Sequence, residues 1–485
     1  MEQAKNNIIT RPLRRINKLS FLQRNARLFM GLTLLFSDIL AISLSLLLAI
    51  AIRYWFGLPI NVSYARYLQL YPLLFVFIGI YSIRHLYAAV GMSPINELKN
   101  ISISTTLVFF LLATFSFLGQ SSMNYSRLIF LMAFVFTLVL VPTFRTIFRW
   151  NLIRLGLWGE PVVILGFGKQ GQHVLSYLRK ESHMGMKPVA VVDGMMPDEE
   201  KTDWNIPFIS FRDISAANIT TAILVPNEFS ASLTAKALSD LKMGFEKLIL
   251  ITDLDWIGST ALISHDMQGV LGLEVEQNLL NPLQMAAKRL LDLLLVLFGS
   301  LVILPFFLLI ILAIRLESRG PAIYRQQRIG KNRRPFYVYK FRTMVANAEE
   351  LLAELLVKDC DLCAEWEQSH KLKNDPRITR VGRFLRKTSL DELPQFYNIW
   401  RGEMSFVGPR PIVEDEVQHY NKVFDLYTQV KPGITGMWQI SGRSDTSYDY
   451  RVQLDEYYIR HWSIWMDIYI LIKTVWKVLK RDGAY

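Results

Sequence analysis

Residues 288–315 read KRLLDLLLVLFGSLVILPFFLLIILAIR, a long apolar stretch with basic residues at both ends and Pro305 near its middle. Lysine and arginine accumulate on the cytoplasmic side of membrane segments, so both ends are expected on that side. Proline removes one backbone donor and can bend a helix. Two arms of about 12 residues would each reach only about 18 Å, which is short of the bilayer core. The stretch therefore predicts a re-entrant helix, broken at Pro305, with a fifth full crossing as the alternative.

Four apolar segments precede this helix, and each is near the ~20 residues that a bilayer crossing needs. They cover residues 29–52, 69–90, 101–119 and 127–148. Residues 1–28 form a strongly basic arm, and basic residues also stand at the exit of the fourth segment: Arg145, Arg149 and Arg154. Four spans return the chain to its starting side. Residues 29–150 are therefore predicted to form a four-helix transmembrane domain with both ends in the cytoplasm.

The composition supports a membrane protein with an anionic partner. Hydrophobic residues make up 51% of the 485 residues, the mean hydropathy is +0.23, and the net charge is +12. Such a charge suits lipid headgroups, phosphorylated substrates or nucleic acid. Nucleic acid is not expected, because no recognition motif accompanies the charge. The two cysteines, Cys360 and Cys363, are too few for a zinc site and are expected to be reduced thiols.

The chain changes character after the transmembrane segments. Short patterns typical of buried strands occur at residues 161–165, 188–192, 221–225 and 247–251, with helical patterns between them. This alternation is typical of a parallel, doubly wound sheet. Residues 151–275 are therefore predicted to form a Rossmann-like cytoplasmic domain.

A glycine pattern lies at the first turn of this domain. Gly166, Gly168 and Gly171 stand between a strand and a helix, and Asp193 follows the next strand at about the distance expected for a ribose contact. These four residues are candidates for nucleotide binding. The alternative is that the glycines allow a tight turn and close helix–strand packing in a scaffold without a cofactor.

Two adjacent carboxylates, Asp391 and Glu392, lie within the stretch RKTSLDELPQ at residues 386–395. Acids beside cations suit a phosphate-bearing substrate and a divalent metal, because the acids can attack phosphorus or hold the metal while the cations neutralise phosphate oxygens. The alternative is structural. Ser389 and Glu392 fit a capping box, or Asp391 could itself cap a helix, and a helix start would explain both acids without catalysis.

Further motifs surround this stretch in a fixed order. They are Lys340-Phe-Arg342-Thr-Met, Asn374-Asp-Pro-Arg377, Gly408-Pro-Arg410-Pro411, Lys431-Pro-Gly433-x-Thr-Gly436-x-Trp438-Gln439 and Ser441-Gly-Arg443. From about residue 283 onward, the set resembles the bacterial sugar transferase family, the monotopic phosphoglycosyl transferases that start glycan assembly on a polyprenyl phosphate. The preceding residues resemble the long form of that family, with four membrane helices and a Rossmann-like domain.

The resemblance implies roles for individual residues. Asp391 would be the nucleophile that attacks the β-phosphorus of a UDP-sugar, and Glu392 would help Asp391 hold Mg²⁺ or Mn²⁺. Trp438 could stack on a base, although packing is the favoured expectation. The implied phosphate ligands are Lys340, Arg386 and Arg410, with Arg342, Arg377 and Arg443 as candidates that could equally be salt-bridge partners.

The resemblance also implies an activity and a location. The expected reaction moves a hexose 1-phosphate from a UDP-sugar to undecaprenyl phosphate through an aspartyl-phosphosugar, with release of UMP. Galactose 1-phosphate is the favoured group, and glucose 1-phosphate is the alternative. It would be the first membrane step of O-antigen, capsule or exopolysaccharide synthesis. The protein would be a multi-pass protein of the bacterial inner membrane that contacts lipids, with a mainly helical catalytic domain, residues 276–485, on the cytoplasmic face. A homodimer is expected, although no residue pattern specifies its interface.

Two other functions are compatible with parts of the sequence. One is a membrane-tethered NAD-dependent sugar-nucleotide enzyme built on residues 166–171, but residues 161–265 lack the Tyr-x-x-x-Lys pair that it would need. The other is a non-enzymatic scaffold in envelope assembly, which leaves the acids and arginines near residue 391 unexplained. Both are therefore less favoured than the transferase.

Overall fold

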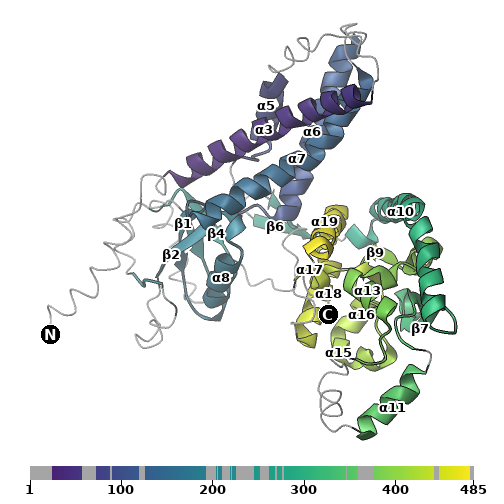
Figure 1. The fold of residues 1–485 in the computed structure, drawn as a ribbon. Helices are drawn as coiled ribbons and strands as arrows, with labels where there is room; N and C mark the ends of the chain where they lie inside the picture. Colours follow the sequence, from purple (N-terminus) through teal and green to yellow (C-terminus); the bar gives the residue numbers. More distant parts are fainter. Residues whose placement is uncertain are drawn as a thin grey trace, which may run out of the picture. The chain divides into compact units, whose positions relative to one another are not determined.

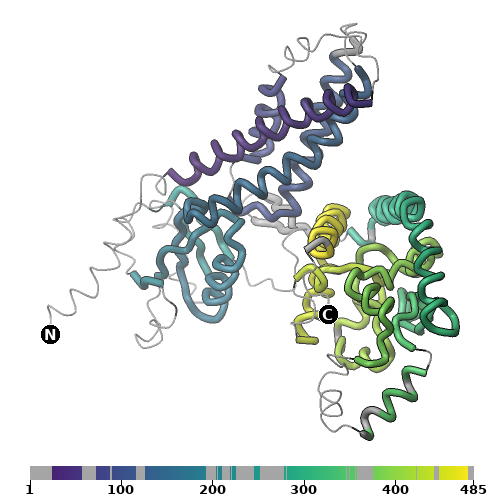
Figure 2. Tube along the Cα trace, in the orientation of Figure 1, coloured from purple at the N-terminus to yellow at the C-terminus, as the bar shows by residue number. Residues whose placement is uncertain are grey.

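The computed structural model describes most of the chain in two compact units, Met1–Leu254 and Asp255–Tyr485 (Figures 1 and 2). The residues described are 25–56, 73–87, 90–118, 126–192, 204, 206–209, 219, 221–225, 245–251, 262–267, 270–275, 278–345, 347–358, 375–441 and 447–480.

The first unit contains the N-terminal apolar helices. They are α3 (Ala26–Trp55), α5 (Leu74–Ile83), α6 (Pro94–Leu118) and α7 (Arg127–Arg154). Four helices of the described chain are long and apolar enough to cross a membrane: α3, α6, α7 and α10 (Pro282–Glu317). Three of the four predicted spans thus correspond to such helices. The second, residues 69–90, lies partly outside the described residues, and its helix α5 has only 10 residues, fewer than a crossing needs.

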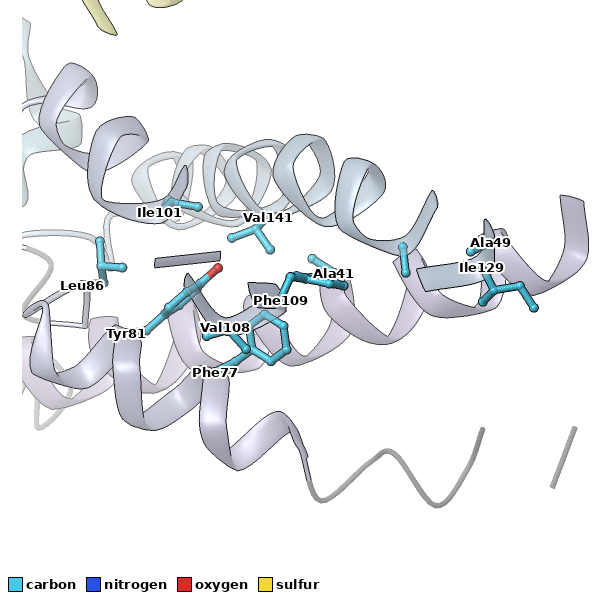
Figure 3. Close-up of a cluster of buried hydrophobic side chains, with 11 residues drawn as sticks. Ala41, Ala49, Phe77, Tyr81, Leu86, Ile101, Val108, Phe109, Ile129 and Val141 are labelled. Carbon is cyan, nitrogen blue, oxygen red and sulfur yellow. The ribbon is translucent and has the colours of Figure 1, made fainter. Parts of the chain in front are cut away.

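The apolar helices pack through small and aromatic side chains. Figure 3 shows Ala41 of α3, Phe77 of α5, Phe109 of α6 and Val141 of α7 in one buried cluster. Small residues such as Ala41 let helix backbones approach closely, which favours packing where lipid replaces water.

A buried ion-pair network ties three of these helices together. Arg145 of α7 is only 1% exposed, and it binds both carboxylate oxygens of Asp38 on α3 at 2.6 and 2.8 Å. Its guanidinium also donates to Glu97 of α6, which pairs in turn with Arg149. Charged groups inside a helix bundle need such partners because their desolvation is costly. Two of the three arginines at the exit of the fourth apolar segment are therefore paired between helices.

The first unit also contains a parallel sheet. Its strands are β1 (Glu160–Leu165), β2 (Met186–Val192), β3 (Thr221–Leu224) and β4 (Lys247–Leu250), in the order β2-β1-β3-β4. All three pairings are parallel, as the sequence predicts. Val163 and Ile164 point to different buried clusters, so β1 is covered on both faces. This explains why its sequence is continuously apolar.

The glycine turn after β1 has a packing role. A Cβ atom at Gly171 in α8 (Lys169–Lys180) would lie 2.3 Å from the carbonyl oxygen of Gly166, so only glycine allows this approach. Gly166 itself has a φ of 94°, a conformation that favours glycine. Gly168 precedes α8 at its N-terminus, while Asp193 lies outside the described residues. The geometry supports the packing interpretation of the pattern and leaves nucleotide binding a prediction.

The second unit is mainly helical. After the hairpin β5 (Leu262–Met267) and β6 (Val270–Val275) comes α10, followed by a second hairpin, β7 (Ile323–Ile329) and β8 (Pro335–Phe341). The remaining elements are α11 (Ala348–Lys358), α13 (Arg380–Thr388), η11 (Leu390–Glu392), α14 (Gln395–Arg401), β9 (Ser405–Val407), α15 (Val417–Tyr420), α16 (Phe424–Tyr427), β10 (Gly433–Thr435), α17 (Met437–Ser441), α18 (Tyr448–Arg460) and α19 (Ile464–Lys480).

The helix α10 is not broken at Pro305, contrary to the sequence prediction. It runs without interruption for 36 residues, with Pro305 inside it. Asn281 caps its start by accepting hydrogen bonds from the N–H groups of Leu283 and Gln284. The helix changes direction along its length (Figure 1), which agrees with the lost donor at an internal proline. Its most apolar window has a mean hydropathy of 3.0 and is only 6% buried, so most of this apolar surface faces outward.

Candidate active site

The β7–β8 hairpin positions the first cations. Lys340 lies opposite Tyr324 in the hairpin register, and the N–H of Arg342 extends the pairing by donating to Ala322 at 2.8 Å. Side chains alternate along an extended backbone, so Lys340 and Arg342 project to the same side. The Nζ of Lys340 lies 2.7 Å from Oε1 of Glu392.

The turn between α13 and η11 brings the two acids to this hairpin. Thr379 caps α13 by accepting from the N–H of Gly382, and a Cβ at Gly382 would lie 2.0 Å from the carbonyl oxygen of Thr343. The absence of a side chain at Gly382 therefore lets α13 lie directly on the residues that follow β8. α13 ends at Ser389, whose φ of 56° is left-handed, and the chain turns at once into η11, which holds Asp391 and Glu392.

The capping interpretation of the two acids is wrong. The side chain of Ser389 makes no capping hydrogen bond, and η11 has only three residues. The next helix, α14, begins at Gln395 with Pro394 as its N-cap residue, so Asp391 does not cap it either. Helix initiation therefore does not account for the paired acids.

The surroundings of Asp391 raise the pKa of its carboxyl group to about 6. Burial is the largest cause, and the neighbouring negative charge of Glu392 adds to it, while Lys340 and Arg386 act in the opposite direction. A carboxylate with a raised pKa is partly desolvated and more basic than an ordinary aspartate. Both properties suit a nucleophile that must remain ionised at neutral pH.

This pKa predicts a pH dependence if Asp391 is the nucleophile that the resemblance implies. In that case only its carboxylate form could attack a UDP-sugar, so the rate of UMP release without lipid acceptor should fall about tenfold per pH unit below about pH 6. Measuring this half-reaction avoids the titration of the acceptor phosphate, which ionises near the same pH. Replacing Glu392 with glutamine removes a negative charge that raises the pKa of Asp391. The loss of any residual activity at acidic pH should therefore begin at a lower pH. If the rate of UMP release by the unaltered protein fell only below about pH 4, the ordinary pKa of an aspartate, the environment described for Asp391 would be contradicted.

The other predicted cations differ in their partners. Arg386 donates through Nε to Thr343 at 3.0 Å, and burial lowers its pKa from the ordinary value. Arg377 forms a two-pronged ion pair with Asp375, at 2.6 and 2.8 Å. Arg342 donates to Ser318, while its Nε and Nη1 are buried without a hydrogen-bond partner in the described chain. Arg443 and Asn374 lie outside the described residues.

One cavity of about 1350 Å³ collects these side chains. Its wall includes both acids and every predicted phosphate ligand that the structure describes: Lys340, Arg342, Arg377, Arg386, Asp391, Glu392 and Arg410. Residues separated by up to 70 positions in sequence are thus placed on one surface, while their individual roles remain predictions.

The sequence interpretation missed Arg451, which lines the same cavity. Its guanidinium carbon lies 5.2 Å from the centre of the Trp438 ring, and that of Arg410 lies 5.5 Å from it. Trp438 is only 8% exposed, so it packs between side chains and offers little surface for a base. No motif contains Arg451. The available signal was its spacing of four residues from Asp455, which places both on one face of a helix.

The two acids fit a divalent cation only in part. In the part of the chain that the structure describes, no cluster of three or more histidine, cysteine or acidic side chains could hold a metal. Mg²⁺ is commonly bound by one or two carboxylates together with substrate phosphates and water. Asp391 and Glu392 could therefore hold Mg²⁺ jointly with a diphosphate, and a site made of protein ligands alone is not expected.

Comparison with known proteins assigns the chain to a family. The model of the bacterial sugar transferase family matches residues 283–481, and a CoA-binding domain model matches residues 78–214. The undecaprenyl-phosphate galactose phosphotransferase of Salmonella typhimurium is 37% identical over 80% of this chain and 82% of its own length. The chain belongs to the bacterial sugar transferase family.

Other members of this family differ in the sugar that their names specify. The UDP-galactose-lipid carrier transferase of Erwinia amylovora is also 37% identical, over 80% of this chain and 82% of its own length. The UDP-glucose:undecaprenyl-phosphate glucose-1-phosphate transferase of Escherichia coli K12 is 32% identical, over 67% of this chain and 68% of its own length. The family match also covers Lys340, Asp391, Arg410 and Arg451, so the cavity described above lies within it.

Proposed function

We propose that this sugar transferase moves a hexose 1-phosphate from a UDP-hexose to undecaprenyl phosphate and releases UMP. The observation that carries the proposal is the position of Asp391, a carboxylate with a raised pKa beside Glu392 and Lys340 in a cavity lined by cations. The relatives named for this reaction cover 80% and 67% of this chain, and the family model matches the residues that line the cavity. The pathway would be the synthesis of a lipid-linked surface polysaccharide.

The proposed mechanism has two displacements at one phosphorus atom. A carboxylate oxygen of Asp391 forms a bond to the β-phosphorus while the bond from that phosphorus to the bridging oxygen breaks, and UMP leaves with the electron pair. An oxygen of the lipid phosphate then attacks the same phosphorus, and Asp391 leaves as a carboxylate. Lys340 and Arg386 would bind the oxygens that gain charge. Bound Mg²⁺, held by Asp391 and Glu392, would neutralise part of the diphosphate charge.

The sugar is proposed to be galactose. Two relatives named for galactose are each 37% identical to this chain over 80% of its length, whereas two relatives named for glucose are 32% and 30% identical over 67% and 73%. Glucose is the second candidate, since the same cavity and the same phosphate chemistry would serve both hexoses.

A UMP-release assay tests the reaction and the sugar together. Purified protein with undecaprenyl phosphate and Mg²⁺ should release UMP faster from UDP-galactose than from UDP-glucose, and a chelator should abolish release until Mg²⁺ is restored. Faster release from UDP-glucose would reverse the sugar assignment. No release from either UDP-hexose by folded protein would refute the proposed function.

We also propose that α10 is re-entrant and that the second unit lies on the cytoplasmic face of the bacterial inner membrane. The apolar outer surface of α10, its direction change and its basic flanks support this. UDP-sugars are cytosolic substrates, which favours the same side. We further propose that the α/β domain, residues 151–275, is Rossmann-like and cytoplasmic. We also propose that the protein forms a homodimer.

Cysteine labelling in intact cells tests the topology. In a variant without Cys360 and Cys363, single cysteines at Leu283 and Arg319 should both resist an impermeant external reagent and react after permeabilisation. Both positions are exposed in the structure. Gly320 is unsuitable as a probe site, because its φ of 121° favours glycine. External labelling at Arg319 but not at Leu283 would establish a fifth span.

A further inference from the structure

Two cations in the cavity wall have no ion-pair partner among the described residues. Neither Arg410 nor Arg451 lies within ion-pair distance of a carboxylate, although the charges of both act on Asp455, whereas Lys340 pairs with Glu392 at 2.7 Å. The Nε of Arg451 is buried and has no hydrogen-bond partner in the described chain. Both guanidinium groups lie against the Trp438 ring and add positive charge to this part of the cavity wall, so the wall is electrostatically suited to an anion.

The fold holds this pair in place through contacts between glycines. β9 and β10 pair in parallel, and the residues after each strand carry Arg410 and Trp438. A Cβ at Gly433 would lie 2.1 Å from the nitrogen of Gly408, and a Cβ at Gly436 would lie 2.3 Å from its carbonyl oxygen. Because none of these glycines has a side chain, the two loops touch and bring Arg410 to the Trp438 ring.

Trp438 and α18 hold the second guanidinium. Arg410 and Arg451 both lie within 5.5 Å of the centre of the Trp438 ring, a distance typical of cation–π contacts. Asp455, on the next turn of α18, accepts a hydrogen bond from the hydroxyl of Tyr420 at 2.7 Å. Burial raises the pKa of Asp455 to about 7, so this carboxyl group offsets only part of the nearby positive charge at neutral pH.

We propose that Arg410 and Arg451, held by Trp438, form a second phosphate-binding subsite in the cavity. The inference rests on the proposed function, in which three phosphate groups take part. Lys340 and Arg386 flank Asp391 and would bind the phosphate under attack, so a second cationic site can bind one of the other two. Guanidinium groups suit the several oxygens of a phosphate, because each can donate two parallel hydrogen bonds. The ligand is either the nucleotide phosphate next to uridine or the phosphate of the lipid acceptor.

Steady-state kinetics of Arg451→Gln in the full-length protein test the subsite and identify its ligand. In a two-displacement mechanism, kcat/KM for each substrate reports its own half-reaction. Losing a charged hydrogen-bond donor should lower kcat/KM about 10- to 100-fold for one substrate and leave the other within about threefold. A fall for the UDP-sugar assigns the nucleotide phosphate, and a fall for undecaprenyl phosphate assigns the lipid phosphate.

Two further variants separate binding from folding. Arg460→Gln removes an exposed arginine from the same helix, where it pairs with Glu456, and should leave both kcat/KM values unchanged. Arg451→Lys keeps the positive charge but replaces the planar guanidinium group with an ammonium group. It should therefore recover part of the activity that Arg451→Gln loses. If Arg451→Gln does not fold, Arg451→Lys should still lower kcat/KM for one substrate at least about threefold.

Two results would overturn the subsite. One is a folded Arg451→Gln protein with both kcat/KM values within about twofold of the unaltered protein. The other is an equal loss for both substrates together with a lower melting temperature. Absence of UMP release by the unaltered protein would instead refute the proposed function, so the two failures are distinguishable.

Discussion

Replacing Asp391 with asparagine should lower the turnover number at least about 10³-fold, equivalent to about 4 kcal/mol of activation free energy. Asparagine keeps the shape of the side chain but cannot act as the ionised nucleophile. Glu392, Lys340 and Arg386 would remain in place, so substrate binding should change far less than turnover. The initial rate of UMP release at saturating UDP-galactose and undecaprenyl phosphate measures the effect.

A matched substitution controls for the change from acid to amide. Asp425 lies on the same unit, is 77% exposed and pairs with Arg333, so Asp425→Asn should retain nearly full activity. If Asp391→Asn turned over near the unaltered rate, direct attack of the lipid phosphate on the UDP-sugar would become the better mechanism.

Replacing Lys288 with methionine should destabilise the second unit by about 3–5 kcal/mol, because it leaves a buried carboxylate without its cation. Lys288 is 8% exposed and pairs with Asp467, which is 1% exposed. Its Nζ also donates to the carbonyl oxygen of Val407 at 2.9 Å and lies 3.2 Å from the hydroxyl of Tyr458. Val407 directly precedes the Gly408–Pro411 motif, so activity should fall together with stability.

Thermal unfolding in detergent tests this second prediction, and a loss of about 10 °C in melting temperature is expected for a unit of this size. The double variant Lys288→Met, Asp467→Asn removes the unpaired charge while keeping an acceptor for Trp462 and Tyr458. It should recover part of the stability, and such coupling is the signature of a direct interaction. If the single variant melted within about 2 °C of the unaltered protein, the buried pair would not be a main support of α10.

The parts of the fold that the sequence predicted are those controlled by local patterns. Long apolar runs predicted α3, α6, α7 and the apolar character of α10, because helix length and hydropathy are properties of one segment. The four strands were predictable because each is a short apolar run, and β1 and β3 in the middle of the sheet are buried along nearly their whole length.

Errors arose where neighbouring segments decide the conformation. Pro305 is compatible with a bend in a continuous helix, so its presence did not end α10. Ser389 matched a capping motif, yet the left-handed turn that ends α13 determines the position of Asp391. Arg451 was not found because its contact with the ring that Arg410 also contacts, Trp438, depends on how separate segments pack. The glycines that bring Arg410 to this ring are Gly408, Gly433 and Gly436.

The most direct test of the account is to look for the covalent intermediate. Protein mixed with UDP-galactose and Mg²⁺ without undecaprenyl phosphate should release UMP in amounts close to one per protein. Mass spectrometry of the digested protein should then show a hexose phosphate on the peptide that contains Asp391, and adding undecaprenyl phosphate should remove it. UMP release that occurs only when lipid is present, with no adduct on that peptide, would contradict the mechanism.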